Sequence, residues 1–478
     1  MHRLILLLSW IGIALGSVQA QAPTSGADGL GDPYFPDLGN GGYDAQHYIL
    51  DLAVDMEDNV IAGTVTMEAT ATQNLSSFNL DFAGFTISKI TVNGAPAADF
   101  SRDERELTII PLTPIATGDA FTTAVAYSGE PREDVDIDGA DFALGWQHYG
   151  DGVFVASEPS GASLWFPVND HPLDKATYAF RITVPHPYNV AANGLQQGKI
   201  DNGDTITYLW EADEPMASYL VAVNIADFVT QSELGPDGVI IRNFFPRDIA
   251  NRAARTFAQT DEMIAFFNTI FGPYPFEAYG VAVADTPLSF ALETQTLSLF
   301  GREIAEAGSW RSTGGAQGVI AHELAHQWFG NSVSLERWQD IWLNEGFATY
   351  ASLLWAEHTA GQTALDRAMR STYEFFDSLP ANRNIPPGSP PPDNLFNVSV
   401  YQRGALTLHA LRLRVGDAAF FSILRAYTDR YRYSNATTAD FIAVAEEVSG
   451  QELDAFFNAW LYDEAIPPIP EMGLGVDA

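Results

Sequence analysis

The sequence predicts a multidomain fold in which a β part precedes an α+β part: an antiparallel β sandwich or saddle, followed by a mostly helical domain. The chain has 478 residues, which is long for a single domain. Hydrophobic residues make up 46% of it and aromatic residues 12%, so both parts can bury a core. Short alternating runs fill residues 43–243, and longer apolar periods follow in residues 244–478.

The first 20 residues are typical of a signal peptide. A basic tip precedes an apolar run, 4–16, and Val18 and Ala20 are small residues at the positions before a signal-peptidase cut. The apolar run is too short to span a bilayer comfortably. We therefore expect export, to the periplasm or as a secreted protein, and no stable membrane insertion after cleavage. Residues 21–42 are rich in Gly, Pro and Asp and are expected to form a loose arm.

Composition restricts the partners of the chain. It has no cysteine, so disulfides and thiolate ligands are excluded, and a metal would be held by imidazole and carboxylate. The formal net charge is −37. Such a charge repels nucleic acid and anionic lipid, so neither is an expected partner.

The β domain is predicted over residues 43–243. Apolar and polar residues alternate there, which is the pattern of strands with one buried face. The clearest runs are "YILDLAVDM", "VIAGTVTMEATA", "KATYAFRITV" and "TITYLWEA". The turn signals "VNGA", "DNGD" and "GPDG" separate the strands and favour antiparallel pairing.

Residues 244–478 are predicted to be mostly helical. "PRDIANRAARTFAQTDEMIAFFNTIFG" has the period of one long amphipathic helix that stops at Gly272-Pro273. Two strand-like segments, "YGVAVAD" and "ETQTLSLF", follow it. The Pro-rich stretch "LPANRNIPPGSPPPDN" predicts a loop.

The motif "AHELAHQWFG" places two histidines four residues apart in a helical pattern. His322 and His326 then share one helix face, about 6 Å apart along the axis. Two imidazoles so placed can bind one Zn²⁺. Glu323 is turned away from the two ligands and can reach a water molecule, as a general base must. A chance match of two surface histidines is the alternative, so a third ligand is needed.

The third ligand is predicted in "WLNEGFATY". Eighteen residues separate Glu345 from His326, and Glu345 lies on a second helical segment, far enough along for the chain to turn and bring the two helices together. His322, His326 and Glu345 would then form a His₂Glu site for one Zn²⁺ per chain, with one position left open.

Several motifs together resemble the aminopeptidase N family, peptidase family M1. "HELAHQWFGNSV" followed by "WLNEGFATY" is similar to its zinc signature. "SEPSGASLWFPVNDHPLDKATYAF", "FALET" and "SVYQRGALTL" resemble three further family segments in the expected order. The resemblance covers the chain from residue 43 onward. It implies that residues 244–478 form a thermolysin-like catalytic domain and that the substrates are peptides with a free N-terminus.

The resemblance also implies roles for individual residues. Glu293 and Glu158 would bind the α-ammonium group of the substrate, for which a partly desolvated carboxylate is the natural partner. The backbone of Ala291 and Leu292 would pair with the substrate strand. Tyr401 would donate its hydroxyl to the developing oxyanion.

Departures from the family pattern leave some properties open. Phe290 and Thr294 replace the usual glycine and asparagine of the segment around Glu293, so the preferred N-terminal residue is not determined. Arg403 stands where the family often has lysine, and we expect it to be structural. The chain stops at the usual end of the catalytic domain, so we expect a more open cleft that admits larger peptides.

Three other functions remain as alternatives. A zinc endopeptidase uses the same zinc motif, and an inactive peptide-binding surface protein could share the scaffold. Epoxide hydrolysis, a side activity in one branch of the family, is not favoured by any residue.

A second, calcium site is a weaker possibility. Asp134, Asp136 and Asp138 begin like a calcium-binding loop, but Gly145 stands where the bidentate glutamate should be. A solvated acidic loop is therefore the favoured interpretation.

Overall fold

The structure is a computed structural model, and it describes residues 22–132, 143–307, 315–380 and 383–475. Two predictions lie outside the described residues: the signal peptide and the acidic loop of Asp134, Asp136 and Asp138. Within the described parts of the chain, no helix is both long enough and apolar enough to cross a bilayer.

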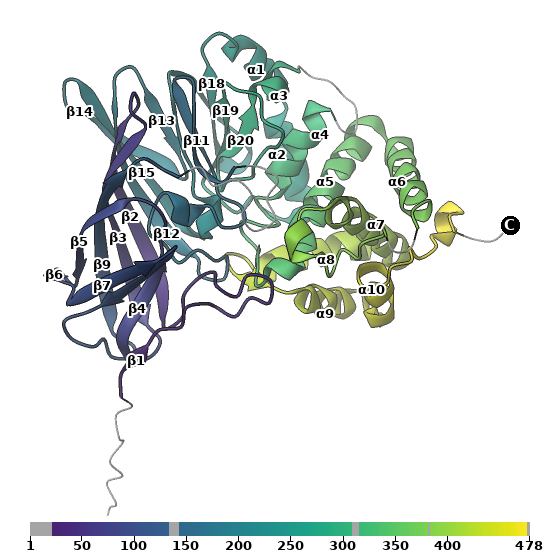
Figure 1. The fold of residues 1–478 in the computed structure, drawn as a ribbon. Helices are drawn as coiled ribbons and strands as arrows, with labels where there is room; N and C mark the ends of the chain where they lie inside the picture. The colour runs from purple at the N-terminus through teal and green to yellow at the C-terminus, as the bar shows by residue number, and fades with distance from the viewer. Residues whose placement is uncertain (1–21, 133–142, 308–314, 381–382, 476–478) are drawn as a thin grey trace, which may run out of the picture.

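A β-rich half is followed by a helical half, as the sequence predicts (Figure 1). The largest sheet of the β half has eight strands. Its order is β14 (Leu195–Asp201), β15 (Thr205–Met216), β12 (Ala176–Pro185), β2 (Tyr43–Asp55), β3 (Val60–Ala71), β9 (Ala120–Gly129), β5 (Thr86–Val92) and β6 (Ala95–Pro96). Only the β12–β2 pair is parallel. Along β2 the buried residues alternate with exposed ones, because successive side chains of a strand point to opposite faces.

Two smaller sheets complete the β half. One has the order β1 (Thr24–Ser25), β4 (Leu75–Asp81), β8 (Glu106–Ile110) and β7 (Asp99–Asp103). The other is antiparallel, with the order β10 (Gly145–Tyr149), β11 (Gly152–Ala156), β16 (Val223–Ala226) and β13 (Asn189–Ala192). The second sheet matters for the site, because β11 leads directly to Glu158.

The helical half begins earlier than the predicted boundary between residues 243 and 244. Its mixed sheet has the order β17 (Phe228–Leu234), β18 (Ile240–Pro246), β19 (Ala278–Ala284) and β20 (Ser298–Gly301). The predicted boundary falls inside β18, which pairs with β19 of the helical half over five residues. Alternation alone could not place this boundary, because β17 and β18 look like any other strands of the first half. The segment "ETQTLSLF" is strand only at its end, since Thr296 adopts a left-handed φ of 65°.

Ten α-helices occur in the described residues. They are α1 (Ala250–Thr256), α2 (Thr260–Phe271), α3 (Arg302–Glu306), α4 (Ala316–Ala325), α5 (Trp342–Ala360), α6 (Gln362–Asp377), α7 (Gly404–Val415), α8 (Asp417–Arg430), α9 (Thr438–Ser449) and α10 (Asp454–Leu461). A π-helical turn, Ser399–Arg403, leads into α7. Short 3₁₀ turns lie at Ala162–Leu164, Ser218–Leu220, Pro236–Gly238, Trp338–Asp340, Pro392–Asn394 and Pro470–Met472. The two-residue strands β21 (Ser334–Leu335) and β22 (Asn435–Ala436) pair with each other.

The single long helix expected after residue 246 is wrong, because the chain forms α1 and α2 with a break between them. Side chains take over the hydrogen bonds that a continuous helix would make. The Thr256 carbonyl accepts from Gln317 Nε2 at 2.7 Å, and the Thr260 hydroxyl donates to the Phe257 carbonyl at 2.8 Å. These partners are remote or local polar groups that hydrophobic periodicity does not report.

The N-terminal arm, which was predicted to be loose, also differs from its prediction. Its described part, residues 22–42, is packed against the molecule rather than loose, with Asp32, Leu38 and Asn40 buried. The Asp32 carboxylate accepts from the Trp338 backbone N–H at 2.8 Å and lies 3.2 Å from His171 Nε2. The arm therefore joins the two halves through hydrogen bonds, which a composition rich in Gly and Pro does not reveal.

Candidate active site

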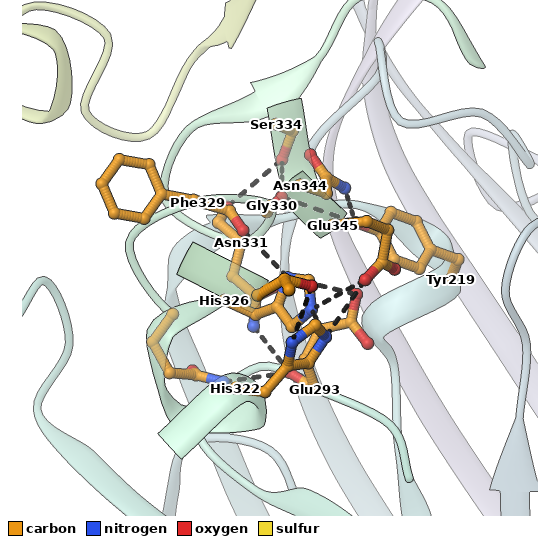
Figure 2. Close-up of polar contacts among 12 residues, drawn as sticks. Tyr219, Glu293, His322, His326, Phe329, Gly330, Asn331, Ser334, Asn344 and Glu345 are labelled. Atoms are coloured by element: carbon orange, nitrogen blue, oxygen red, sulfur yellow. Dashed lines mark hydrogen bonds and ion pairs between the residues drawn. The ribbon is translucent and has the colours of Figure 1, made fainter. Parts of the chain in front are cut away.

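Two helices carry the predicted metal ligands. His322 lies in α4 and His326 is the residue at its C-terminal end, while Glu345 lies in the first turn of α5. The two Nε2 atoms are 3.0 Å apart. Glu345 Oε2 lies 3.1 Å from His322 Nε2 and 3.5 Å from His326 Nε2 (Figure 2). The three predicted ligands therefore meet at one point.

The spacing of these donors fits a zinc ion. Ligands about 2.0–2.1 Å from a tetrahedral Zn²⁺ lie about 3.3 Å from one another, close to the three separations observed. His326 Nδ1 is 3.0 Å from the Phe329 carbonyl, so this nitrogen donates and Nε2 is left as the metal ligand. This backbone partner of His326 was not predictable from the motif. The donor set of two imidazoles and one carboxylate is the one that a catalytic zinc requires.

Charges around the ligands favour an ionised Glu345. Burial alone would raise the pKa of its carboxyl, but the adjacent His326 and His322 outweigh burial and hold the pKa at about 2. Burial lowers the pKa of His322, so its imidazole is neutral near pH 7 and its Nε2 lone pair is free to bind a cation.

Glu323 lies beside the ligands without belonging to them. Its carboxylate, Glu293 and His326 have donor atoms that all lie within 4.8 Å of one another. The side chain is buried, and burial raises its pKa well above the usual range, with a further rise from Glu293 and Glu345 that His326 opposes. A basic carboxylate near the metal position can accept a proton from water.

Two more carboxylates converge from separate halves of the molecule. Glu158 follows β11 of the β half, and Glu293 precedes β20. Oxygen atoms of Glu158, Glu293 and Glu345 lie within 4.8 Å of one another. Both Glu158 and Glu293 are buried, and among the described residues neither Oε1 has a hydrogen-bond partner. Burial raises the pKa of each, and the neighbouring Glu293 raises that of Glu158 further.

Unpaired buried carboxylates are costly, and a cation placed between them removes that cost. The two predicted amine-binding residues thus form a pocket suited to a positively charged group, immediately next to the metal ligands.

Tyr401 lies in the π-helical turn before α7, a kind of irregularity that often marks a functional site. Its ring stacks on the ring of His322 with centroids 6.1 Å apart. Burial and the surrounding carboxylates raise its pKa well above 10, so the hydroxyl keeps its proton and can donate it in a hydrogen bond.

Two glycines set the distance between this turn and α5. A Cβ on Gly404 would lie 2.9 Å from the Gly346 Cα, too close for any larger residue without displacement of the backbone. Gly346 directly follows Glu345, so the Gly346–Gly404 contact holds the Tyr401 turn next to the metal ligand.

The predicted backbone contacts with substrate need a correction. Leu292 N–H donates to the Leu299 carbonyl at 3.0 Å, and Leu299 N–H donates to the Leu292 carbonyl at 2.7 Å. Backbone groups of successive residues in an extended chain point to opposite sides. The Leu292 groups are therefore already paired, and those of Ala291 face the other way, where a substrate strand could bind.

A cleft of about 990 Å³ opens from the site. His322 and Tyr401 are among its lining residues, together with residues of α2, α4, α5 and α6. Glu158 and Glu293 are not among its lining residues.

The chain matches two domains of one family. Residues 255–460 match the peptidase family M1 domain, and residues 44–220 match the peptidase M1 N-terminal domain. It is 26% identical to endoplasmic reticulum aminopeptidase 1 of Homo sapiens over 82% of this chain, but it spans only 44% of that protein. It is 27% identical to leucine aminopeptidase 2 of Sclerotinia sclerotiorum, over 89% of this chain and 74% of that one.

Solved structures give the same assignment. The M1 zinc metallopeptidase of Deinococcus radiodurans superposes with a TM-score of 0.83 at 31% identity, over 92% of this chain and 98% of that one. A mutant of that protein bound to a Tyr-Ser-Ala substrate superposes with a TM-score of 0.84 at 31% identity, over 93% of this chain and 100% of that one. Together with the donor set, which fits the single zinc that the family implies, these matches show that the chain belongs to peptidase family M1.

Proposed function

We propose that the chain is a zinc-dependent aminopeptidase, which removes the first residue of peptides that have a free α-amino group. The carboxylate pocket carries this proposal. Glu158 and Glu293 place unpaired, buried oxygens beside the metal ligands, where the ammonium group of a substrate would be held by charge-assisted hydrogen bonds. Fixing the ammonium there presents only the first peptide bond to the reacting groups. The aminopeptidase names of the relatives support the same conclusion.

His322, His326 and Glu345 would hold the zinc. When bound, Zn²⁺ polarises the scissile carbonyl and lowers the pKa of a water molecule. Glu323 accepts the proton of the attacking water and later passes it to the leaving amine. Tyr401 donates its hydroxyl to the oxyanion that develops on the carbonyl, and the Ala291 backbone pairs with the substrate.

The part of the bound peptide that follows its first residue would lie in the cleft that His322 and Tyr401 line. The ammonium group would be held at Glu158 and Glu293, so the substrate would extend from these carboxylates past the predicted metal ligands toward the cleft. Nucleic acid is not a partner in this proposal, since the net charge of −37 repels it.

The test is a panel of fluorogenic aminoacyl amides, each assayed with a free and with an acetylated α-amino group. We expect hydrolysis of the free forms only, loss of activity with a zinc chelator, and recovery when zinc is added back. The Glu323→Gln variant should bind the same zinc and hydrolyse at least about 100-fold more slowly. Equal cleavage of acetylated forms would indicate an endopeptidase, and inactivity of the zinc-loaded protein would indicate a peptide-binding protein.

We also propose that the chain is exported with removal of residues 1–20. The basic tip and the small residues before Gln21 support this. N-terminal sequencing of the protein from fractionated cells should start at Gln21 in the exported fraction. Full-length protein that starts at Met1 and stays in the cytoplasm would contradict export.

A further inference from the structure

Two buried amide side chains hold the loop that carries Glu293 against the turn that directly follows α4, the helix of His322. Gln327 Nε2 donates to the Glu293 carbonyl at 3.0 Å, and Asn331 Nδ2 donates to the same oxygen at 2.7 Å (Figure 2 for Asn331). Gln327 Oε1 accepts from the Thr296 N–H at 2.8 Å. Gln327 thus bridges both ends of the turn from Glu293 to Thr296. Both amides are fully buried.

The position of the Glu293 carboxylate depends on this backbone. Its Oε1 has no hydrogen-bond partner among the described residues, and His326 Nδ1, which donates to the Phe329 carbonyl, is 4.0 Å away. No side-chain bond to Oε1 therefore orients the carboxylate. The backbone carbonyl of Glu293 accepts hydrogen bonds from Gln327 and Asn331, and these two bonds fix the point from which the side chain extends.

The same loop is joined to the β half, which carries the other amine-binding residue. Lys175 Nζ donates to the Asn331 carbonyl at 2.9 Å and to the Ser332 carbonyl at 3.0 Å. Asn331 therefore connects three parts of the site: the β half with Glu158, the turn that follows α4, and Glu293.

We propose that Gln327 and Asn331 are positioning residues that set the Glu293 carboxylate relative to the zinc ligands and so determine the recognition of the substrate's free amine. They touch neither substrate nor metal and act through the Glu293 backbone. This inference rests on the proposed aminopeptidase function, and it assigns amine selectivity to two residues outside the amine pocket itself.

The experiment compares a ligand that has the amine with one that lacks it. Binding of L-leucinamide and of 4-methylpentanamide is measured by calorimetry on zinc-loaded protein in a Glu323→Gln background, which prevents turnover. The quantity of interest is the ratio of the two dissociation constants. Gln327→Leu and Asn331→Leu remove the amides at nearly constant size.

We expect each substitution to lower the preference for leucinamide about tenfold, because each removes at least one buried hydrogen bond from the Glu293 carbonyl. Zinc content should stay at one per chain, since no ligand is changed. A purely structural role would lower the melting temperature and weaken both ligands equally, leaving the ratio unchanged, and that result would overturn the proposal.

Gln317 provides the matched control. It is a buried glutamine of α4, the helix that ends just before Gln327, but its Nε2 donates to the Thr256 carbonyl and not to the loop of Glu293. Gln317→Leu should lower stability and leave the ratio unchanged, whereas a drop equal to that of Gln327→Leu would overturn the proposal. If the parent protein itself does not prefer leucinamide, the aminopeptidase function fails instead, so the two failures are distinguishable.

Discussion

Arg403 offers the sharpest test of how the site is built, because one buried guanidinium holds the C-terminal segment against the Tyr401 turn. Its side chain is 0% exposed. It donates to the backbone carbonyls of Trp460 at 3.0 Å, Asp463 at 2.5 Å and Glu464 at 3.2 Å, and to the Asn384 side chain at 3.1 Å. We predict that Arg403→Met destabilises the protein severely and that Arg403→Lys does so mildly.

The expected loss in the free energy of unfolding follows from the hydrogen-bond acceptors that lose the Arg403 donor. Arg403→Met removes the donor from three carbonyls, of which that of Trp460 belongs to a buried residue, and each buried acceptor left without its donor costs at least about 1 kcal/mol. The Asn384 side-chain oxygen is also buried and also loses its donor, so the two buried acceptors set an expected loss of about 2–4 kcal/mol for Arg403→Met. A lysine keeps the charge and three donors but loses the forked geometry, so we expect a loss of about 1–2 kcal/mol.

The assay is urea unfolding of the zinc-loaded protein, followed by tryptophan fluorescence, together with hydrogen exchange of the segment after α10. Arg403→Met should lower the unfolding midpoint and speed exchange in residues 459–465, and Arg403→Lys should lie between it and the parent. If Arg403→Met unfolds within about 1 kcal/mol of the parent and exchange is unchanged, the assigned role is refuted.

Three further predictions follow from the site and the core. Tyr401→Phe should keep the ring stacked on His322 and the zinc content at one per chain, but lower kcat about 10²–10³-fold through loss of the oxyanion donor; an unchanged kcat in steady-state assays would remove Tyr401 from the mechanism. Gly404→Ala should lower the melting temperature and kcat together, because its Cβ would meet the Gly346 Cα at 2.9 Å; a calorimetric scan that matches the parent would contradict this packing. Burial and nearby acids raise the pKa of Asp174 to about 8 and that of Glu106 to about 7. Between about pH 4 and 8 these two carboxyls therefore bind more protons in the folded chain than in the unfolded chain, and their contribution makes the free energy of unfolding fall as pH rises through that range. Urea unfolding at pH 5 and pH 8 measures the fall, which should be smaller in Asp174→Asn; a free energy that rises with pH would show that the sign is wrong.

The sequence was sufficient to predict the order of the two halves and to predict that His322, His326 and Glu345 lie together. The period of two in residues 43–243 predicted the β half, and the i, i+4 spacing of His322 and His326 predicted their common helix face. These features are local, because strand alternation and helical rise are set by the covalent geometry of a few consecutive residues.

Several features could not be predicted from the sequence, because they depend on polar contacts between distant segments. The break between α1 and α2 depends on Gln317, and the packed arm depends on Asp32 bonding to Trp338. The helical half starts at β17 because β17 pairs with β18, and β18 pairs with β19 of that half. Hydrophobic periodicity contains no information about such partners.

By itself, then, the sequence determined which residues we propose to carry the chemistry: two imidazoles in one motif, a carboxylate on the next helix, and acids at positions that resemble a known family. Only the tertiary structure decided how those residues lie. It brought Glu158 from the β half to within 4.8 Å of Glu293 and Glu345, and it fastened the Glu293 loop to the turn that follows α4 through Gln327 and Asn331. Spacing along one helix is fixed by bond lengths and angles, whereas the separation of residues 158, 293 and 345 is fixed by the packing of whole elements against one another.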